Sequence, residues 1–249
     1  MRKGMTKHRA VKTVQPLMDE TAPFQVAESY KTLRTNLVFS LAGIPVRERN
    51  NVVIVSSSLP GEGKSTTCAN LALSMAQKNE KVLIVDADLR KPTQNRIFKV
   101  GNETGLSEAL INGETDGVIY GSIRPRLDLL TSGPQPPNPS ELLASHAMSE
   151  ILDALAAVYD YVFIDTPPVN VVTDALVLSP QASGILLVID PNTVTHEELQ
   201  SALESIEMSG ARLLGSVLTN LRGESLQSSG RSKRYSYAAA YGYSGESQT

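Results

Sequence analysis

The sequence has little cysteine, no long hydrophobic run and little net charge, and each absence excludes a class of protein. Cys68 is the only cysteine, so an internal disulfide is impossible, which suits a reducing cytoplasm. No apolar run approaches the roughly 20 residues needed to cross a bilayer. A formal net charge of −3 gives no overall attraction to nucleic acid. The 249 residues, 41% of them hydrophobic, suffice for the core of one sizeable α/β domain.

A glycine-rich segment carries the strongest functional signal. The apolar run 52–55 precedes it and a helical pattern over 65–77 follows it. Strand, glycine-rich turn and helix form the context of a phosphate-binding loop, because glycines let backbone N–H groups approach an anion. A plain surface turn is the alternative, and the flanking strand and helix argue against it. We therefore predict nucleoside triphosphate binding, with the lysine on the outer phosphates and the serine on Mg²⁺. The predicted binding residues are Pro60, Gly61, Glu62, Gly63, Lys64, Ser65 and Thr66.

Two further apolar segments end in aspartate. Residues 81–85 lead into Asp86 and Asp88, and residues 161–164 lead into Asp165. In open α/β sheets, ligands bind at the carboxyl ends of strands, the edge that the phosphate loop occupies. Asp165 is therefore predicted to hold Mg²⁺, directly or through water. The other two aspartates point the same way if the strand continues. They are either acceptors for a metal or a substrate proton or part of an ordinary turn, and the shared edge favours catalysis.

Apolar strands alternate with helical segments along most of the chain. This order predicts an α/β fold of the P-loop NTPase type, with a doubly wound, mostly parallel sheet flanked by helices. Asn220 follows the last strand and is a candidate for reading a base or a loop. Further strands are expected at 127–130, 184–189 and 213–218, and helices at 105–110, 148–158, 173–178 and 196–208.

The two ends of the chain differ from this central part. Residues 1–22 are polar and basic, and we expect a flexible arm that is either a solubilising tail or a contact for anionic lipid or a partner. We expect residues 223–249 to form a second flexible tail and the nucleotide-binding domain to span 23–222. The tail contains half of the eight tyrosines, which favours phosphorylation over a docking tail or an accident of composition. These tyrosines are Tyr235, Tyr237, Tyr241 and Tyr243.

An amphipathic helix is expected over 28–41, before the first strand. Glu28, Lys31 and Arg34 recur every three residues on the side opposite its apolar face. This charged side is either a solvated face with a local ion pair or an electrostatic contact between subunits.

Taken together, these motifs resemble those of the bacterial tyrosine kinases, the BY-kinase family, over about residues 25–249. Segments 60–66, 82–90 and 162–168 are similar to the Walker A, A′ and B motifs of that family. The chain looks most like the cytoplasmic kinases that Gram-positive bacteria encode apart from their membrane activator, in capsule and exopolysaccharide systems. MinD and ParA-like ATPases typically carry a signature lysine at the position of Leu59, which argues against that branch.

The resemblance implies an ATP- and Mg²⁺-dependent protein-tyrosine kinase. Lys64 would hold the phosphates, and Ser65 and Asp165 would organise Mg²⁺. Asp86 would accept or orient the tyrosine hydroxyl, and Asp88 would support it or the water shell of the metal. The family also implies transfer in trans, between subunits, onto the tail tyrosines, and control of polysaccharide synthesis and export.

Partners are implied in the same way. They are a transmembrane activator of the polysaccharide co-polymerase type, a cognate tyrosine phosphatase, protein substrates and further copies of the chain in a ring-like homo-oligomer, with no nucleic acid expected. The activator would recruit this cytoplasmic chain to the inner face of the membrane. The oligomerisation motif of the family, E-x-x-R-x-x-R, reads Glu28, Lys31 and Arg34 here, so charge is kept at its middle position but bidentate geometry is not. The alternatives are a MinD/ParA-like ATPase switch without kinase activity and a scaffold whose ATP site only stabilises the fold.

Overall fold

A seven-stranded sheet forms the centre of the computed structural model, which describes residues 17–18, 22–45 and 50–221. Within this part the strand order is β3-β4-β2-β5-β1-β6-β7, and every neighbouring pair is parallel except β3 and β4. The predicted doubly wound, mostly parallel sheet is therefore confirmed. The strands are β1 (Val52–Ser57), β2 (Val82–Asp86), β3 (Ile119–Arg124), β4 (Leu127–Leu130), β5 (Tyr161–Asp165), β6 (Gly184–Ile189) and β7 (Leu213–Leu218).

Strand β3 is the one described strand that the sequence pattern did not predict. It lies at the edge of the sheet, none of its residues is buried, and its pairing with β4 is irregular between Tyr120 and Arg124. Gly121 and Ser122 interrupt its apolar pattern, and Ser122 adopts a left-handed backbone with φ 55°. An exposed edge strand needs no continuous apolar run, so its sequence carries little strand signal.

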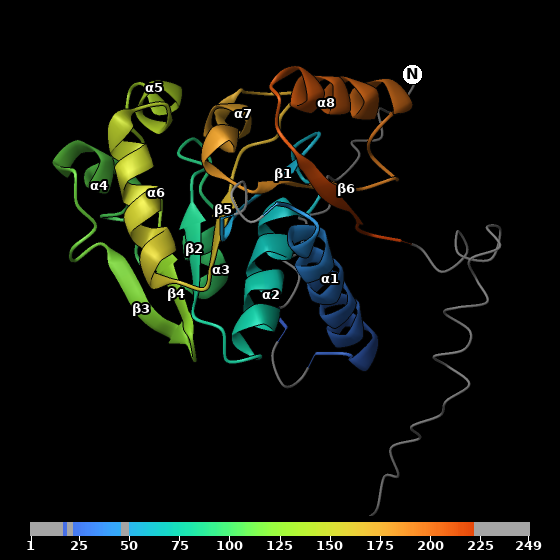
Figure 1. Cartoon of the computed structure of the whole chain (residues 1–249), viewed down its shortest axis with the longest axis horizontal. Helices are drawn as coiled ribbons and strands as arrows, with labels where there is room; N and C mark the ends of the chain where they lie inside the picture. Colours follow the sequence, from blue (N-terminus) through green and yellow to red (C-terminus); the bar gives the residue numbers. More distant parts are fainter. Residues whose placement is uncertain (1–16, 19–21, 46–49, 222–249) are drawn as a thin grey trace, which may run out of the picture.

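Helices cover both faces of the sheet (Figure 1). One face packs against α1, α2 and α3, and the other packs mainly against α4, α6, α7 and α8. The short α3 had not been predicted, and α1 begins earlier than the predicted helix 28–41. The helices are α1 (Phe24–Ala42), α2 (Lys64–Ala76), α3 (Gln94–Phe98), α4 (Leu106–Asn112), α5 (Pro139–Leu143), α6 (His146–Val158), α7 (Asp174–Leu178) and α8 (His196–Met208).

The central strands are apolar at nearly every position because both of their faces are buried. Along β1, Val53 and Val55 point into the cluster with α1 and α2, whereas Val52 and Ile54 point into the opposite cluster. Successive side chains of a strand alternate between faces, so a sheet covered on both sides needs apolar residues at consecutive positions. This explains why short apolar runs predicted these strands well.

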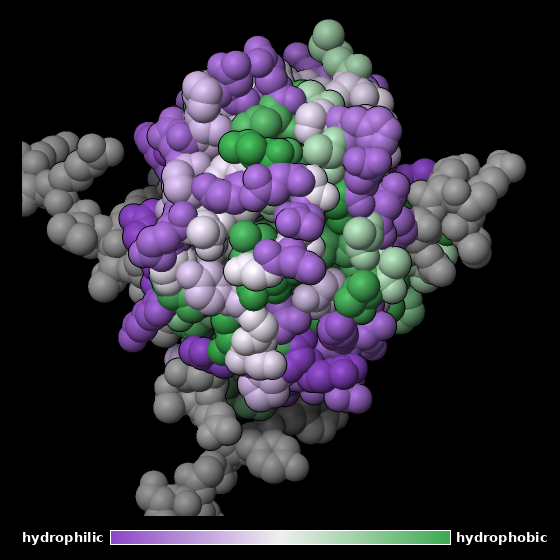
Figure 2. All heavy atoms as spheres, turned by 90° about the vertical axis from the view of Figure 1, so that its left-hand side faces the viewer, coloured by the Kyte–Doolittle hydropathy of each residue, from purple (hydrophilic) through white to green (hydrophobic). Residues whose placement is uncertain are grey.

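The face over α4, α6 and β3 is mostly hydrophilic, with hydrophobic residues in small groups (Figure 2). Ile111 and Val158 are exposed hydrophobic residues of α4 and α6. Isolated exposed apolar side chains are ordinary on a globular domain. None of the described helices combines the length and the apolar character that a membrane span requires.

Part of the predicted 1–22 arm packs against the domain. Met18 is buried, and its backbone N–H donates a hydrogen bond of 2.6 Å to Asn70 Oδ1 in α2. The arm prediction is therefore wrong at this residue, because its apolar side chain finds a place beside α2. The other residues before 22, apart from Leu17, lie outside the described part of the chain.

Candidate functional site

The loop between β1 and α2 has the backbone of a phosphate-binding loop. Gly61 and Gly63 have φ values of 89° and 95°, in the left-handed region that other residues rarely adopt. Gly63 is the N-cap of α2, and its carbonyl accepts from the N–H of Thr67 at 2.8 Å. The first N–H groups of a helix have no partner within it, so this turn presents an anion-binding end of α2 at the carboxyl edge of the sheet.

Glu62 braces this loop. Its side chain is fully buried, and its carboxylate accepts from the N–H groups of Leu59 at 2.6 Å and Asp190 at 3.0 Å. Its backbone carbonyl accepts from the hydroxyl of Thr219 at 2.7 Å. Sequence reasoning placed Glu62 among the nucleotide-binding residues, whereas in the structure its carboxylate ties the loop to the end of β6 and its backbone carbonyl ties it to the end of β7.

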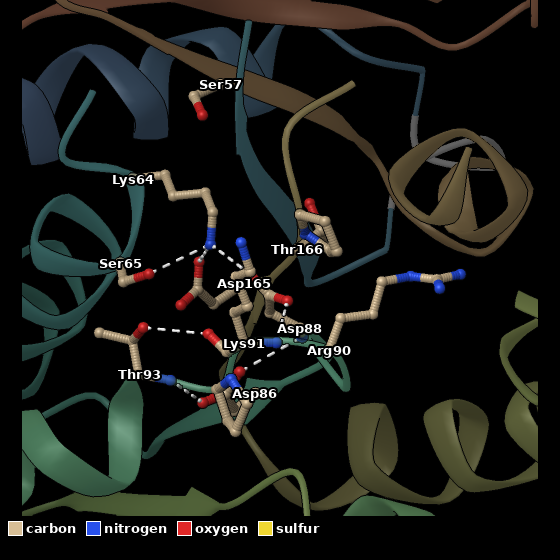
Figure 3. A network of polar contacts seen from close by, with 12 residues as sticks. Ser57, Lys64, Ser65, Asp86, Asp88, Arg90, Lys91, Thr93, Asp165 and Thr166 are labelled. Carbon is tan, nitrogen blue, oxygen red and sulfur yellow. Dashed lines mark hydrogen bonds and ion pairs between the residues drawn. The ribbon is translucent and has the colours of Figure 1, made fainter. Parts of the chain in front are cut away.

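Lys64 brings three parts of the site together (Figure 3). Its Nζ lies 3.0 Å from Asp88 Oδ2, 3.4 Å from Asp165 Oδ1 and 3.2 Å from Ser65 Oγ. Burial alone would lower the pKa of Lys64, but the charges of Asp165 and Asp88 raise it above its ordinary value. The lysine therefore remains an ammonium ion among the predicted metal and phosphate ligands.

Asp86 and Asp88 do not share one direction. Strand β2 ends at Asp86, so the strand geometry assumed from the sequence does not continue to Asp88. The fully buried carboxylate of Asp86 accepts from the backbone N–H groups of Asp88, Thr93 and Gln94 at 3.2, 3.0 and 2.9 Å. Burial, and then the charge of Asp165, raise its pKa to about 7. Asp86 is thus a carboxyl group that titrates near neutral pH.

A cavity of about 620 Å³ opens over the loop. Pockets of roughly 300–1,000 Å³ are typical for small-molecule ligands. All predicted loop residues in 60–66 line it except Glu62, and Asp88 and Asn220 line it too. Asp86 and Asp165 are absent from its lining within the described chain and lie fully buried behind it. The structure thus brings the three predicted motifs together, with one of the three aspartates facing the cavity.

Comparisons with known proteins agree with this arrangement. Residues 50–213 match the family model described as AAA domain. The chain is 37% identical over 244 residues to the tyrosine-protein kinase YwqD of Bacillus subtilis (strain 168), covering 97% of this chain and 96% of that protein. It is also 37% identical over 212 residues to the putative tyrosine-protein kinase CapB of Staphylococcus aureus, covering 84% and 91%. This chain belongs to the bacterial tyrosine-protein kinases.

Solved structures place the kinase in the same family. The chimerical protein CapA2B2 is similar with a TM-score of 0.74 and 42% identity, covering 81% of this chain and 86% of that one. The kinase domain of the Escherichia coli tyrosine kinase ETK is similar with a TM-score of 0.72 and 35% identity, covering 79% of this chain and 77% of that one. A plasmid partition protein from Borrelia burgdorferi, covering 73% and 84%, has a TM-score of 0.56 and 23% identity, so it shares the fold alone. The family of tyrosine kinases is therefore favoured over the partition-like ATPase branch.

The kinase cavity continues past the loop to Arg90, which sequence reasoning noted only within a motif. In Figure 3 its side chain extends away from the Lys64 cluster. Its guanidinium donates to Ser140 Oγ at 2.9 Å and pairs with Asp174 Oδ2 at 3.4 Å, and Ser140 Oγ donates to Asp174 Oδ1 at 2.6 Å. These partners come from α5 and α7, far from Arg90 in the sequence, so no motif spacing predicts them. They fix an arginine in the wall of a cavity that is also lined by the apolar Val171.

Asn220 lies at the rim of the cavity, as its predicted role in nucleotide binding requires. Its Nδ2 donates to Asp190 Oδ2 at 2.6 Å, and its carbonyl accepts from Asn192 Nδ2 at 2.9 Å. These bonds hold the segment after β7 against the end of β6. Base reading by Asn220 remains a prediction.

The three charged residues of the predicted subunit contact are in different environments. Glu28 and Lys31 form an exposed ion pair of 2.7 Å on α1. Arg34 is half-buried, and its guanidinium donates to the carbonyl and the hydroxyl of Ser74 in α2 at 2.5 and 3.1 Å. The single charged face expected from the sequence is therefore wrong for Arg34, because α2 packs beside α1 and supplies its acceptors. The predicted tail phosphorylation sites Tyr235, Tyr237, Tyr241 and Tyr243 lie outside the described residues.

Proposed function

We propose that this protein is an ATP-dependent protein-tyrosine kinase that phosphorylates the tyrosines of its own tail, 223–249, in trans. The observation that carries the proposal is Lys64 of the phosphate loop, held by Asp88 and Asp165 beside a cavity of nucleotide size. Relatives named as tyrosine-protein kinases, similar along nearly the whole chain, support it. The proposal extends to control of capsular or extracellular polysaccharide synthesis and export.

ATP and Mg²⁺ are the proposed cofactors. The loop backbone and Lys64 would bind the phosphates, and Ser65 and Asp165 would hold Mg²⁺, which neutralises charge developing on the phosphates. These oxygens fit the cation, because a positive ammonium already lies 3.2 and 3.4 Å from them. No group of three or more Asp, Glu, His or Cys side chains suited to a metal exists among the described residues. One carboxylate and one hydroxyl suit Mg²⁺, which usually takes one or two protein carboxylates and keeps phosphates and water as its other ligands.

Asp86 is the proposed acceptor of the tyrosine proton. The phenol has a pKa near 10, so it needs a base at neutral pH. A pKa of about 7 matches that task. Asp88 lines the cavity and positions Lys64, so its proposed role is to orient the reacting groups. Asp86 lies behind the lining and accepts from the backbone N–H of Asp88, which lines the cavity.

Incubation of the purified chain with Mg-ATP, followed by phosphosite mapping by mass spectrometry, tests the proposal. We expect phosphate on the tail tyrosines, and none in Lys64→Met. ATP hydrolysis without phosphotyrosine would instead support the MinD/ParA-like switch. Nucleotide binding with neither hydrolysis nor transfer would support a scaffold. Mixing Lys64→Met with a wild type lacking 223–249 tests transfer in trans, because only the variant then offers tail tyrosines.

The proposed partners follow from the same family. They are a transmembrane activator that recruits the kinase to the inner face of the membrane, a tyrosine phosphatase, protein substrates and other copies of the chain. The exposed pair of Glu28 and Lys31 offers charge for a subunit contact. Phosphorylation adds about −1.5 to −2 charges to each tail tyrosine, which Asp88 and bound ATP would repel. Light scattering should therefore show an oligomer for Lys64→Met and a monomer for the phosphorylated wild type. Equal masses would contradict this role of the tail.

A further inference from the structure

Gln94 is a fully buried side chain that no recognised motif contains. It is the first residue of α3 and follows Asp86 by eight positions in the sequence. Its Nε2 donates to Asp165 Oδ2 at 2.8 Å and to the carbonyl of Ser65 at 3.0 Å. Its backbone N–H donates to Asp86 Oδ2 at 2.9 Å. One residue therefore contacts the phosphate loop and two of the three buried aspartates of the site.

The orientation of the Gln94 amide is fixed by its neighbours. Nε2 donates to a carboxylate, which carries a negative charge, and to a carbonyl oxygen, which carries a partial negative charge. Turning the amide over would place Oε1 against these two acceptors, which is unfavourable. Oε1 itself is buried and has no hydrogen-bond partner. An unpaired buried oxygen destabilises a fold, so glutamine at this position carries a penalty that a hydrophobic residue would avoid.

The contact decides how the Asp165 carboxylate is presented. Asp86 and Asp165 are paired across β2 and β5, so two fully buried carboxylates lie side by side. Gln94 holds Oδ2 of Asp165, and this leaves Oδ1 facing Lys64 at 3.4 Å. The same residue holds Oδ2 of Asp86 through its backbone. Both carboxylates are thus prevented from rotating.

We propose that Gln94 is a positioning residue that orients Asp165 for the cation bound with ATP. Gln94 itself does not line the cavity. The inference rests on the proposed function, since it assumes that Asp165 serves Mg²⁺. Hydrogen bonds that orient a metal-ligating carboxylate typically change metal affinity or activity by about 10- to 100-fold when removed.

Gln94→Met tests the proposal with a matched control. Methionine has a similar length and volume but cannot donate to Asp165. Asn95→Leu changes the next residue of α3, whose Oδ1 is likewise buried and unpaired and which does not line the cavity. The fluorescent nucleotide mant-ATP would be bound to the full chain in EDTA, and MgCl₂ would then be titrated. Far-ultraviolet circular dichroism and thermal unfolding would confirm that each variant is folded.

For Gln94→Met, we expect mant-ATP affinity in EDTA within about threefold of the wild type, because the loop and Lys64 remain. The MgCl₂ concentration for half-maximal change should rise about tenfold or more. Asn95→Leu should follow the wild type in both measurements. A MgCl₂ titration of Gln94→Met that overlays that of the wild type would overturn the inference. So would a loss of mant-ATP affinity in EDTA as large as the change in the MgCl₂ requirement. A wild type that shows no Mg²⁺-dependent nucleotide binding would instead overturn the proposed function.

Discussion

Two polar clusters at opposite ends of β2 and β5 use lysine and aspartate differently. At the amino ends, Lys81 Nζ lies 4.6 Å from the centroid of the Tyr159 ring, and the Tyr159 hydroxyl donates to Asp128 Oδ2 at 2.8 Å. Burial, and then the Asp128 carboxylate, raise the pKa of Tyr159, so the phenol stays neutral. Lys81 and Asp128 are half-buried, so water still reaches their charges. This cluster stabilises the fold.

The carboxyl ends hold three buried carboxylates against one buried ammonium. These are Asp86, Asp88 and Asp165 against Lys64. Buried negative charge without full compensation is unfavourable, and it appears as the pKa of about 7 for Asp86. Residue types alone therefore do not separate the functional cluster of this chain from the structural one. An excess of buried charge of one sign, which a bound cation would relieve, does separate them.

Replacing the lysine of each cluster by methionine should give the largest difference in autophosphorylation between the clusters. Lys64→Met removes the charge beside the phosphates, and we expect autophosphorylation to fall by about 1,000-fold or more. Lys81→Met loses only a contact with an aromatic ring, and its activity should stay within about twofold of the wild type because its charge lies far from the phosphates. Phosphotyrosine immunoblots, and the incorporation of labelled phosphate from radiolabelled ATP, measure autophosphorylation of both variants. Comparable losses in the two variants would erase the distinction.

Replacing an aspartate should also have different effects on phosphate transfer in the two clusters. Asp86→Asn keeps one of the two oxygens that accept backbone N–H groups but cannot take a proton, so transfer should fall by about 100-fold. Its mant-ATP affinity should remain within about threefold, because Asp86 does not line the cavity. Asp128→Asn should leave the transfer rate unchanged. Near wild-type transfer by Asp86→Asn would remove Asp86 from the reaction.

The stability of the nucleotide-free protein should depend on pH through the carboxyl-end cluster. The pKa of Asp86 is about 7 in the folded chain and about 3.9 in the unfolded chain. Between these values the folded state binds more protons, so the free energy of unfolding falls as pH rises, by at most about 1.4 kcal/mol per pH unit. Urea unfolding in EDTA at pH 5, 6, 7 and 8 measures this slope. Asp86→Asn should lack this contribution, and parallel slopes for the two proteins would show that burial does not raise this pKa.

The smallest effect is expected at the amino ends. Tyr159→Phe removes the hydrogen bond to the half-buried Asp128 and should lower the free energy of unfolding by about 1–2 kcal/mol. Autophosphorylation should be unchanged. Urea unfolding at pH 7 measures the loss, and a change in transfer rate would show that the two clusters are coupled through β5.

The sequence predicted features that are local. Runs such as 52–55 and 184–189 became strands because both of their faces are buried, and the phosphate loop was predicted because its residues are consecutive. The ends of β2 and β5 placed the aspartates at the correct edge. Strand β3 gave no signal, since an exposed edge strand tolerates Gly121 and Ser122.

Features made by tertiary contact could not be predicted in this way. Gln94, whose amide contacts two other motifs, looks like an ordinary polar residue after a proline-containing turn. Arg34 reads as part of a charged helix face, and only the position of α2 shows that it is turned inward. Ser140 and Asp174 meet at Arg90 from segments separated by 34 residues. Helical periodicity and motif spacing do not report such contacts.

The brace made by Glu62 has a consequence for the tail. Through hydrogen bonds of 3.0 and 2.7 Å, Glu62 joins the phosphate loop to Asp190 and Thr219. Thr219 lies two residues before Leu221, where the described chain ends. The last described residues and the cradle for the phosphates are therefore tied together by hydrogen bonds. Any residue that follows Leu221 therefore starts from a point whose position is set by the same glutamate that braces the phosphate loop.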